Sequence, residues 1–193
     1  MFLPIVAYGH PILRKVAVEI QPDYPGLEKL ISDMWETIQH DGIGVGLAAP
    51  QINKSIRLFV VDTAQVFTNR DEFDEDQYPD APGIQSVFIN PKIISLDGEM
   101  VMHNEGCLSI PRLREDVKRH ESVTISYLDE HFNPHEKTFN GLTARVILHE
   151  YDHLEGKLFI DHISPLKRTL MKRKLDDISK GKIKPEYRMI FNK

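Results

Sequence analysis

The sequence predicts an α+β fold, in which antiparallel sheets pack around one central helix and a further helix lies near each end of the chain. Three observations support this fold class. Apolar residues recur at helical spacing in residues 25–40 and again in residues 141–156. Between these segments lie short runs of alternating apolar and polar residues separated by turn residues, as in antiparallel sheets. A third helical segment, residues 165–179, follows the second.

Length and composition are those of one globular domain. The chain has 193 residues, 41% of them hydrophobic and 27% charged, which is enough for a proper core. The first seven residues are apolar but lack a basic start, so we expect neither a signal peptide nor a membrane-spanning segment. A single cysteine excludes an intramolecular disulfide and suits the reducing cytoplasm. We therefore expect a cytoplasmic protein that binds neither membrane nor DNA.

The first helix is predicted over residues 25–40. Asp23 is its expected N-cap, and the Asp41-Gly42 pair is its expected end. Its apolar positions are spaced three and four apart, as on the buried face of a helix: Leu27, Leu30, Ile31, Met34, Trp35 and Ile38.

Three alternate glycines follow, in the stretch from Gly42 to Gln51. Glycine lets the backbone adopt a positive φ or lets another chain approach closely, as when a peptide lies along a strand edge. The stretch lacks the Gly-Lys-Ser/Thr sequence of a phosphate loop. Gln51 is its only long polar side chain, and the amide can donate a hydrogen bond to a developing oxyanion.

Short strands are predicted through the middle of the chain. They are residues 56–61, 87–90, 92–96, 100–103, 121–128 and 137–139. The Asp97-Gly98 pair is expected to form a hairpin turn. Residues 62–86 are predicted to be a long inserted loop. Its acidic residues lack the fixed spacing of a calcium loop, so a solvated insertion is expected.

The predicted helix at residues 141–156 contains two histidines, His149 and His153. Their spacing of four places both on one face, with Cβ atoms about 5–6 Å apart, close enough for both rings to bind one metal ion. Leu142 and Val146 continue this face, so the histidines are expected to point into the protein from a central metal-binding helix. The alternative is a pair of satisfied or surface histidines without a metal.

The third ligand distinguishes between classes of metalloprotein. Metzincin proteases continue His-Glu-x-x-His with x-x-Gly-x-x-His, and this chain matches up to Gly156 but has Phe159 where the last histidine belongs. After the helix, the next glutamate is Glu186, in the basic tail. Cys107, between two predicted strands, is the best available third ligand. A thiolate and two imidazoles leave a fourth position open, as in catalytic sites.

Three motifs together resemble those of peptide deformylases of the bacterial type. They occur in the order and spacing of that family, at residues 44–51 (Gly-Val-Gly-Leu-Ala-Ala-Pro-Gln), 105–109 (Glu-Gly-Cys-Leu-Ser) and 149–156 (His-Glu-Tyr-Asp-His-Leu-Glu-Gly). The resemblance covers most of the chain. Leu148 stands where many members have glutamine, and residues 62–86 are longer than in compact bacterial forms, so the subclass stays open.

The resemblance implies that residues 1–193 form a single catalytic domain, a metal-dependent hydrolase. It would remove the N-formyl group from the N-terminal formylmethionine of newly synthesised proteins, with nascent formylmethionyl peptides as its partners. Cys107, His149 and His153 would bind one divalent ion, usually Fe(II), with Ni, Co or Zn as substitutes. Such an ion lowers the pKa of its water from about 15.7 toward about 7, and Glu150 is expected to take the proton as that water attacks the formyl carbon.

The resemblance also implies substrate contacts. The Gln51 side chain and the Leu108 backbone N–H would polarise the formyl oxygen. The substrate peptide would lie like an added strand, held by the backbone of Val45, Gly46 and Gly106. The side chains expected around the methionine are Val45, Leu142, Arg145 and Val146.

Three further residues have two interpretations each. Glu105 and Arg119 either form an ion pair that braces the loop containing Cys107 or have surface or helix-capping roles. Asp152 either orients a metal ligand or has a surface or helix-capping role. Two rival functions also remain. A metallopeptidase shares the helix but needs another third ligand, and a structural metal module usually closes its shell with four protein ligands.

The C-terminal helix and tail, residues 167–193, are strongly basic. They hold ten Lys and Arg against three acidic residues, a balance of +7 that leaves −12 on the rest of the chain. One interpretation is a solvated helix face. The other, which the resemblance also suggests, is contact with ribosomal RNA through Lys167, Arg168, Lys172, Arg173 and Lys174.

Overall fold

The computed structural model describes residues 2–40, 44–68, 80 and 82–192. Most of the regular structure belongs to one antiparallel sheet with the strand order β2-β3-β4-β5-β6. Its strands are Gly46–Ala48, Leu58–Asp62, Gln85–Cys107, Ile110–Leu128 and Pro134–Asn140. The predicted α+β class with antiparallel pairing is therefore confirmed.

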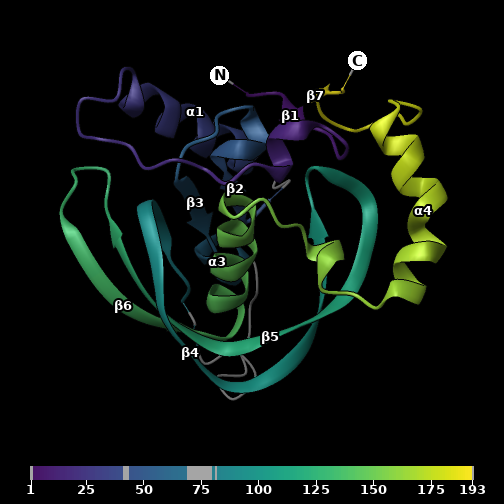
Figure 1. Cartoon of the computed structure of the whole chain (residues 1–193). Helices are drawn as coiled ribbons and strands as arrows, with labels where there is room; N and C mark the ends of the chain where they lie inside the picture. The colour runs from purple at the N-terminus through teal and green to yellow at the C-terminus, as the bar shows by residue number, and fades with distance from the viewer. Residues whose placement is uncertain (1, 41–43, 69–79, 81, 193) are drawn as a thin grey trace.

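Strands β4 and β5 form one long hairpin, which corrects the prediction of several short strands. Residues 85–107 are continuous, and Asp97-Gly98 is not a hairpin turn: the pairing shifts register between Asp97 and Met100 and then continues. Extra residues at such bulges bend a strand without ending it, and Gly98 supplies a positive φ of 75° there. Figure 1 shows the result, a hairpin that curves beneath the helix α3.

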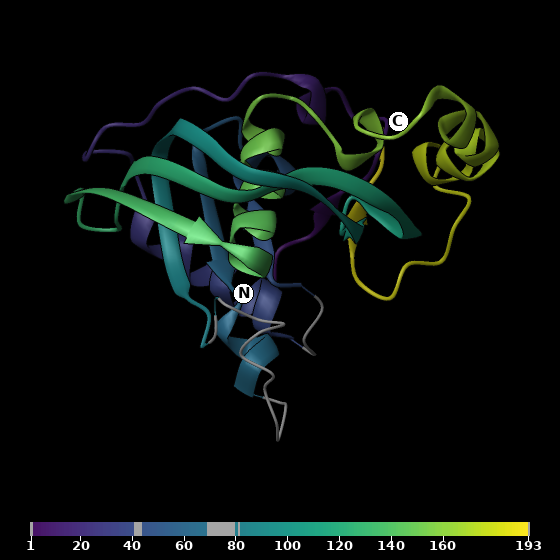
Figure 2. The ribbon, with the colours of Figure 1, turned by 90° about the horizontal axis from the view of Figure 1, so that it is seen from below.

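The sheet separates two cores because residues of one strand alternate between its faces. Leu58 and Val60 of β3 pack on the same side as the helix α1 (Leu27–Gln39), whereas Phe59 and Val61 pack on the side of α3 (Gly141–Leu154). β3 is consequently buried along its whole length. Both helices lie within the predicted segments, and α3 lies within the curve of the sheet in both views (Figures 1 and 2).

The start of α1 differs from the prediction. Its N-cap is Gly26, with a φ of 72°, rather than Asp23, so the helix begins two residues later than expected. A left-handed residue at this position turns the chain into the helix without a side-chain cap. The predicted end at residues 41–42 lies outside the described residues.

The predicted loop at residues 62–86 contains regular structure at its edges. Residues 64–68 form the short helix α2 (Ala64–Thr68), Asp62 ends β3, and residues 85 and 86 begin β4. Residues 69–79 and 81 lie outside the described residues, so an inserted loop there stays a prediction.

The C-terminal region adds a helix and a strand. Helix α4 spans Pro165–Ser179, as predicted, and begins at a Ser164 cap whose side chain accepts a hydrogen bond from the Lys167 N–H. After it, β7 (Met189–Ile190) pairs in parallel with β1 (Ile5–Val6), which brings the two ends of the chain together (Figure 1). Within the described residues, every helix is too short or too polar to cross a membrane.

Candidate metal centre

Three potential metal ligands converge where β4 meets α3. The ligand atoms of Cys107, His149 and His153 all lie within 4.8 Å of one another. The Cys107 Sγ lies 3.3 Å from the His153 Nε2, and the two imidazole rings have centroids 5.2 Å apart. No second group of this kind occurs in the described part of the chain. The cysteine and the two histidines thus meet in space although 42 residues of sequence separate Cys107 from His149.

Two backbone features bring the cysteine and the helix together. Cys107 ends β4 and pairs with Ile110 across a turn of two residues, which fixes the thiol at the end of the hairpin. On the opposite side, β2 packs directly on α3. A Cβ on Gly46 would lie 2.6 Å from the Glu150 Oε1 and 2.9 Å from the Val146 Cγ1, so only glycine allows this approach.

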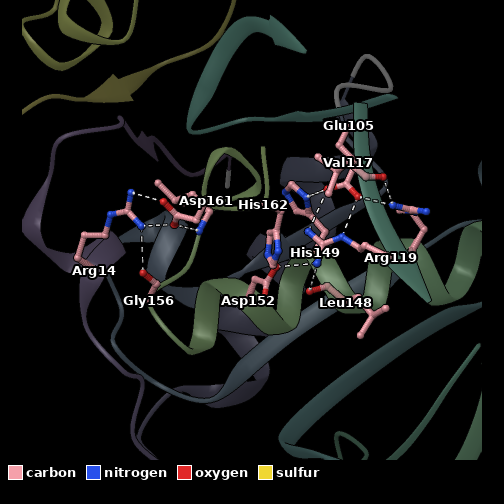
Figure 3. Close-up of polar contacts among 12 residues, drawn as sticks. Arg14, Glu105, Val117, Arg119, Leu148, His149, Asp152, Gly156, Asp161 and His162 are labelled. Atoms are coloured by element: carbon pink, nitrogen blue, oxygen red, sulfur yellow. Dashed lines mark hydrogen bonds and ion pairs between the residues drawn. The ribbon is translucent and has the colours of Figure 1, made fainter. Parts of the chain in front are cut away.

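Glu105 holds the first histidine from behind the centre. Its Oε2 accepts a hydrogen bond from the His149 Nδ1 at 3.0 Å, and its two oxygens also accept from Arg119 at 2.8 and 3.0 Å. Arg145 Nη1 donates to the Oε1 at 3.0 Å. The Glu105 and Arg119 side chains are 4% and 6% exposed, which excludes the surface role for this pair. Figure 3 shows the contacts of Glu105 with His149 and Arg119.

The charges around Glu105 favour its ionised form. Burial alone would raise its pKa, but the hydrogen bonds from His149 and Arg119 and the charge of Arg119 hold the pKa well below its ordinary value. A carboxylate that accepts the Nδ1–H fixes the tautomer of His149 and leaves its Nε2 for a metal.

Asp152 extends this network to the surface. Its Oδ2 accepts from Arg119 Nη1 and from His162 Nε2, each at 2.7 Å (Figure 3). Burial opposes its ionisation, yet the hydrogen bond from His162 and the Arg119 charge lower its pKa. Asp152 therefore reaches His149, one of the three potential ligands, indirectly through Arg119 and Glu105.

Glu150 lies beside the three ligands with an unsatisfied carboxylate. The residue is 4% exposed, and its Oε2 has no hydrogen-bond partner among the described residues. Burial raises its pKa to about 7, against the opposing charges of His149 and His153. A buried carboxylate oxygen without a partner is costly, so Glu150 is a candidate functional group of this site.

The electrostatics of the thiol also fit a cation. Burial would raise the pKa of Cys107, but the charges and hydrogen bonds of His153 and His149 lower it to about 5. Burial would lower the pKa of His149, but its hydrogen bonds to Cys107 and Glu105 raise it to about 10, which shows that positive charge is favoured next to the thiolate. Cysteine is therefore held as a thiolate, which is the form that binds metals. With two imidazoles it makes a donor set that suits Fe, Co, Ni or Zn rather than Mg or Ca.

The predicted site residues border one cavity of about 610 Å³. Those that line it are Val45, Gly46, Gln51, Gly106, Cys107, Leu108, Leu142, Arg145, Val146, His149 and Glu150. The remaining one, His153, lies behind the cavity wall and is 1% exposed. The guanidinium of Arg145 is held by Glu105 and by the carbonyl oxygens of Val117 and Val101. These contacts satisfy both terminal nitrogens of the guanidinium within the protein.

The Gln51 amide is oriented toward the same place. Its Oε1 accepts a hydrogen bond from the Ala48 N–H at 2.8 Å, which leaves its Nε2 3.5 Å from both the Cys107 Sγ and the Ser109 Oγ. This orientation presents an N–H donor to the region next to the sulfur.

Several residues that line the cavity were missed in the sequence. Tyr187 and Glu186 come from the C-terminal segment, and His103, Arg112 and Arg114 come from the β4–β5 hairpin. None of them belongs to a motif with defined spacing. A hairpin read as separate short strands also conceals that residues 103 and 114 lie close together.

Comparisons with known proteins identify the family. A family model described as polypeptide deformylase matches residues 2–169. Peptide deformylases from Christiangramia forsetii and Flavobacterium johnsoniae are 52% and 51% identical over 191 residues, which is 99% of this chain and 96% of each relative.

Solved structures agree. A peptide deformylase from Legionella pneumophila superposes with a TM-score of 0.78 at 39% identity, covering 96% of this chain and 100% of that one. One from Acinetobacter baumannii, bound to Met-Ala-Ser, gives 0.73 at 35% identity and covers 84% and 99%. The chain therefore belongs to the peptide deformylase family.

Proposed function

We propose that the deformylase reaction of this chain takes place in the 610 Å³ cavity, with Cys107, His149 and His153 as metal ligands and Glu150 as the general acid and base. The family acts on nascent formylmethionyl peptides and depends on a metal. The observation that carries the proposal is the buried, unpartnered carboxylate oxygen of Glu150 beside three converging ligand atoms. Residues 1–193 would form one catalytic domain.

The three ligands would present the Cys107 Sγ, the His149 Nε2 and the His153 Nε2. The His149 nitrogen follows from its hydrogen bond to Glu105, and the His153 nitrogen from its approach to the sulfur. A divalent ion held there supplies Lewis-acid chemistry, polarising a carbonyl oxygen and lowering the pKa of water toward about 7. We propose Fe(II) as this ion, with Ni, Co or Zn as substitutes, because the mixed thiolate and imidazole set suits these metals.

Glu150 would move the protons of the reaction. Its carboxylate is held on α3 one residue from His149, and its Oε2 is free of other hydrogen bonds among the described residues. It is proposed to take a proton from the attacking water and to pass it to the nitrogen that leaves the formyl carbon. The burial of the carboxylate keeps bulk water from competing for that proton.

The formyl oxygen would meet two N–H donors. The Gln51 Nε2 is oriented by the bond between its Oε1 and the Ala48 N–H, and the Leu108 N–H lies in the turn beside Cys107. Donors fixed in advance stabilise a developing oxyanion, and losing one typically costs about 10²–10³ in rate.

The peptide would lie along β2 and beside Gly106. In the described sheet β2 is an edge strand, hydrogen-bonded to β3 only, so its other edge can pair with an added strand. Val45, Leu142 and Val146, with the aliphatic part of Arg145, would surround the methionine side chain. The solved relative bound to Met-Ala-Ser supports this class of ligand.

We further propose a cytoplasmic location and ribosome contact through α4. Lys167 and Arg168 form ion pairs with Glu115 and Asp161, whereas Lys172, Arg173 and Lys174 are exposed on the helix. The last three are therefore better placed to contact RNA phosphates. Replacing all three by glutamine should weaken ribosome binding and should make the affinity depend less on salt concentration. Unchanged binding would reject the contact.

Formate release from formyl-Met-Ala-Ser tests the catalytic assignment. Glu150→Gln should bind metal normally and lose about 10²–10⁴ in kcat, whereas Glu28→Gln, on the exposed side of α1, should match the wild type. An active Glu150→Gln protein would reject the role of Glu150. Acetyl-Met-Ala-Ser and unblocked peptides serve as further substrates, because cleavage of an internal peptide bond would indicate a metallopeptidase instead.

A further inference from the structure

The C-terminal segment forms part of the cavity wall, although it lies beyond residues 2–169, which the family model matches. Tyr187 lines the cavity together with Cys107, Leu108 and Glu150. Its hydroxyl donates a hydrogen bond to the Leu108 carbonyl oxygen at 2.7 Å. A residue near the end of the chain thus contacts the residue whose N–H is proposed to face the formyl oxygen.

The segment that carries Tyr187 is fixed to the body of the protein. The Ile5 N–H donates to the Arg188 carbonyl at 2.9 Å, and the Ala7 N–H donates to the Ile190 carbonyl at 2.8 Å. These are the bonds of the parallel β1–β7 pair, seen near the two chain ends in Figure 1. The backbone that follows Tyr187 is therefore held in place by the N-terminal segment.

The N-terminal segment just after β1 holds the other half of the turn. The Tyr8 N–H donates to the Ser109 carbonyl at 2.8 Å, next to the bond from Tyr187 to the Leu108 carbonyl. Both carbonyl groups of the turn after Cys107 are thus held by residues from the two ends of the chain. Because each peptide group is planar, these bonds directly hold the Leu108–Ser109 and Ser109–Ile110 peptide groups. They restrict the preceding Cys107–Leu108 peptide group, which carries the Leu108 N–H, through the φ and ψ of Leu108.

We propose that Tyr187 is a positioning residue for deformylation, which holds the Leu108–Ser109 turn so that the Leu108 N–H points at the formyl oxygen. The inference rests on the proposed role of Leu108. Burial and the nearby charge of Cys107 raise the pKa of Tyr187, so its hydroxyl keeps the proton that it donates. Because the contact acts on the turn rather than on the substrate, it should affect kcat more than KM.

The test compares Tyr187→Phe with the wild type and with Tyr24→Phe. Tyr24 is also half-buried on the α1 core, and its hydroxyl has no hydrogen bond within the described part of the chain, so it controls for loss of a hydroxyl. With formyl-Met-Ala-Ser and equal metal content, Tyr187→Phe should lose about three- to tenfold in kcat with KM within about twofold, as expected for one neutral hydrogen bond. Tyr24→Phe should match the wild type.

Amide hydrogen exchange gives a second measurement that does not depend on activity. Peptides that span residues 105–113 should exchange faster in Tyr187→Phe, and those from α1 should not change. A kcat of Tyr187→Phe within twofold of the wild type, or unchanged exchange at the turn, would overturn the proposal. Absence of formate release by the wild type would instead contradict the proposed function, while the exchange data would still report on the contact.

Discussion

His149 donates its Nδ1–H to the buried carboxylate of Glu105 at 3.0 Å, and this bond determines which ring nitrogen faces Cys107 and His153. The same carboxylate compensates two buried arginines, Arg119 and Arg145. Glu105 consequently has two functions. It orients His149, a proposed metal ligand, and it neutralises charge in the interior between β4, β5 and α3.

Glu105→Gln should therefore weaken both metal binding and the fold. We expect metal affinity to fall about 10–100-fold, as when the partner of a ligating histidine is removed. The free energy of unfolding should fall by about 3–5 kcal/mol, because Arg145 loses its buried counter-charge and Arg119 keeps only that of Asp152. Competition with a chelator and urea unfolding measure the two effects. Glu115→Gln is the control. Glu115 lies opposite Glu105 in the β4–β5 pairing, but its carboxylate forms an ion pair with Lys167 near the surface. Equal losses in both variants would contradict this account.

Asp80 should stabilise the N-terminus of the metal-binding helix. Its Oδ2 accepts hydrogen bonds from the Thr143 N–H and Oγ1, each at 2.7 Å, while the N-cap residue Asn140 makes no capping bond with its side chain. Asp80→Ala should lower the free energy of unfolding by about 1–2 kcal/mol, as loss of a cap does. Asp23→Ala, at the exposed position wrongly predicted as a cap, should change it by less than about 0.5 kcal/mol. An unaffected Asp80→Ala protein would exclude this cap.

The Asp161 carboxylate should contribute a pH-dependent part of the stability. Burial opposes its ionisation, but hydrogen bonds from Arg14 and the Leu158 N–H, with the charges of Arg14 and Arg168, lower its pKa from 3.8. Figure 3 shows its contact with Arg14. A pKa lowered by folding adds stability above the unfolded value, and this stability is lost as the pH falls through the folded value.

Asp161→Asn should thus lower the free energy of unfolding by about 1 kcal/mol near neutral pH. The difference between variant and wild type should shrink as the pH falls below about 4. Urea unfolding at a series of pH values measures it. A difference that stays constant over the whole series would show that the ionised carboxylate is not responsible.

The iron-loaded protein should lose activity in air. Cys107 is held as a thiolate that borders the cavity, and thiolates are the form of cysteine that oxidises. Mass spectrometry of the peptide containing Cys107 should show added oxygen as formate release declines, and loading fresh protein with nickel should preserve activity. Iron protein that keeps full activity in air for days would contradict the prediction.

The helices and the ligands could be predicted because each depends on short sequence spacing. α1 and α3 show helical periodicity, and the bounds of α4 agree with the predicted segment, residues 165–179. The spacing of His149 and His153 on a helix fixes their separation. The single cysteine left few choices for the third ligand, and the structure brings it to the histidines.

The features that were missed depend on long-range pairing. Asp97-Gly98 in β4 is a sequence typical of a turn. Because β4 continues to pair with β5 beyond it, these residues form a bulge within one strand instead. β1 and β7 are two residues each, too short to show any periodicity. The contact between Tyr187 and Leu108 joins residues 79 positions apart and belongs to no motif.

Metal analysis and formate release, measured together on anaerobically purified protein, test the central claim most directly. The account predicts that the wild type carries one divalent ion per chain and deformylates formyl-Met-Ala-Ser, and that Cys107→Ala loses both the ion and the activity. A Cys107→Ala protein that releases formate at the wild-type rate without bound metal would contradict it.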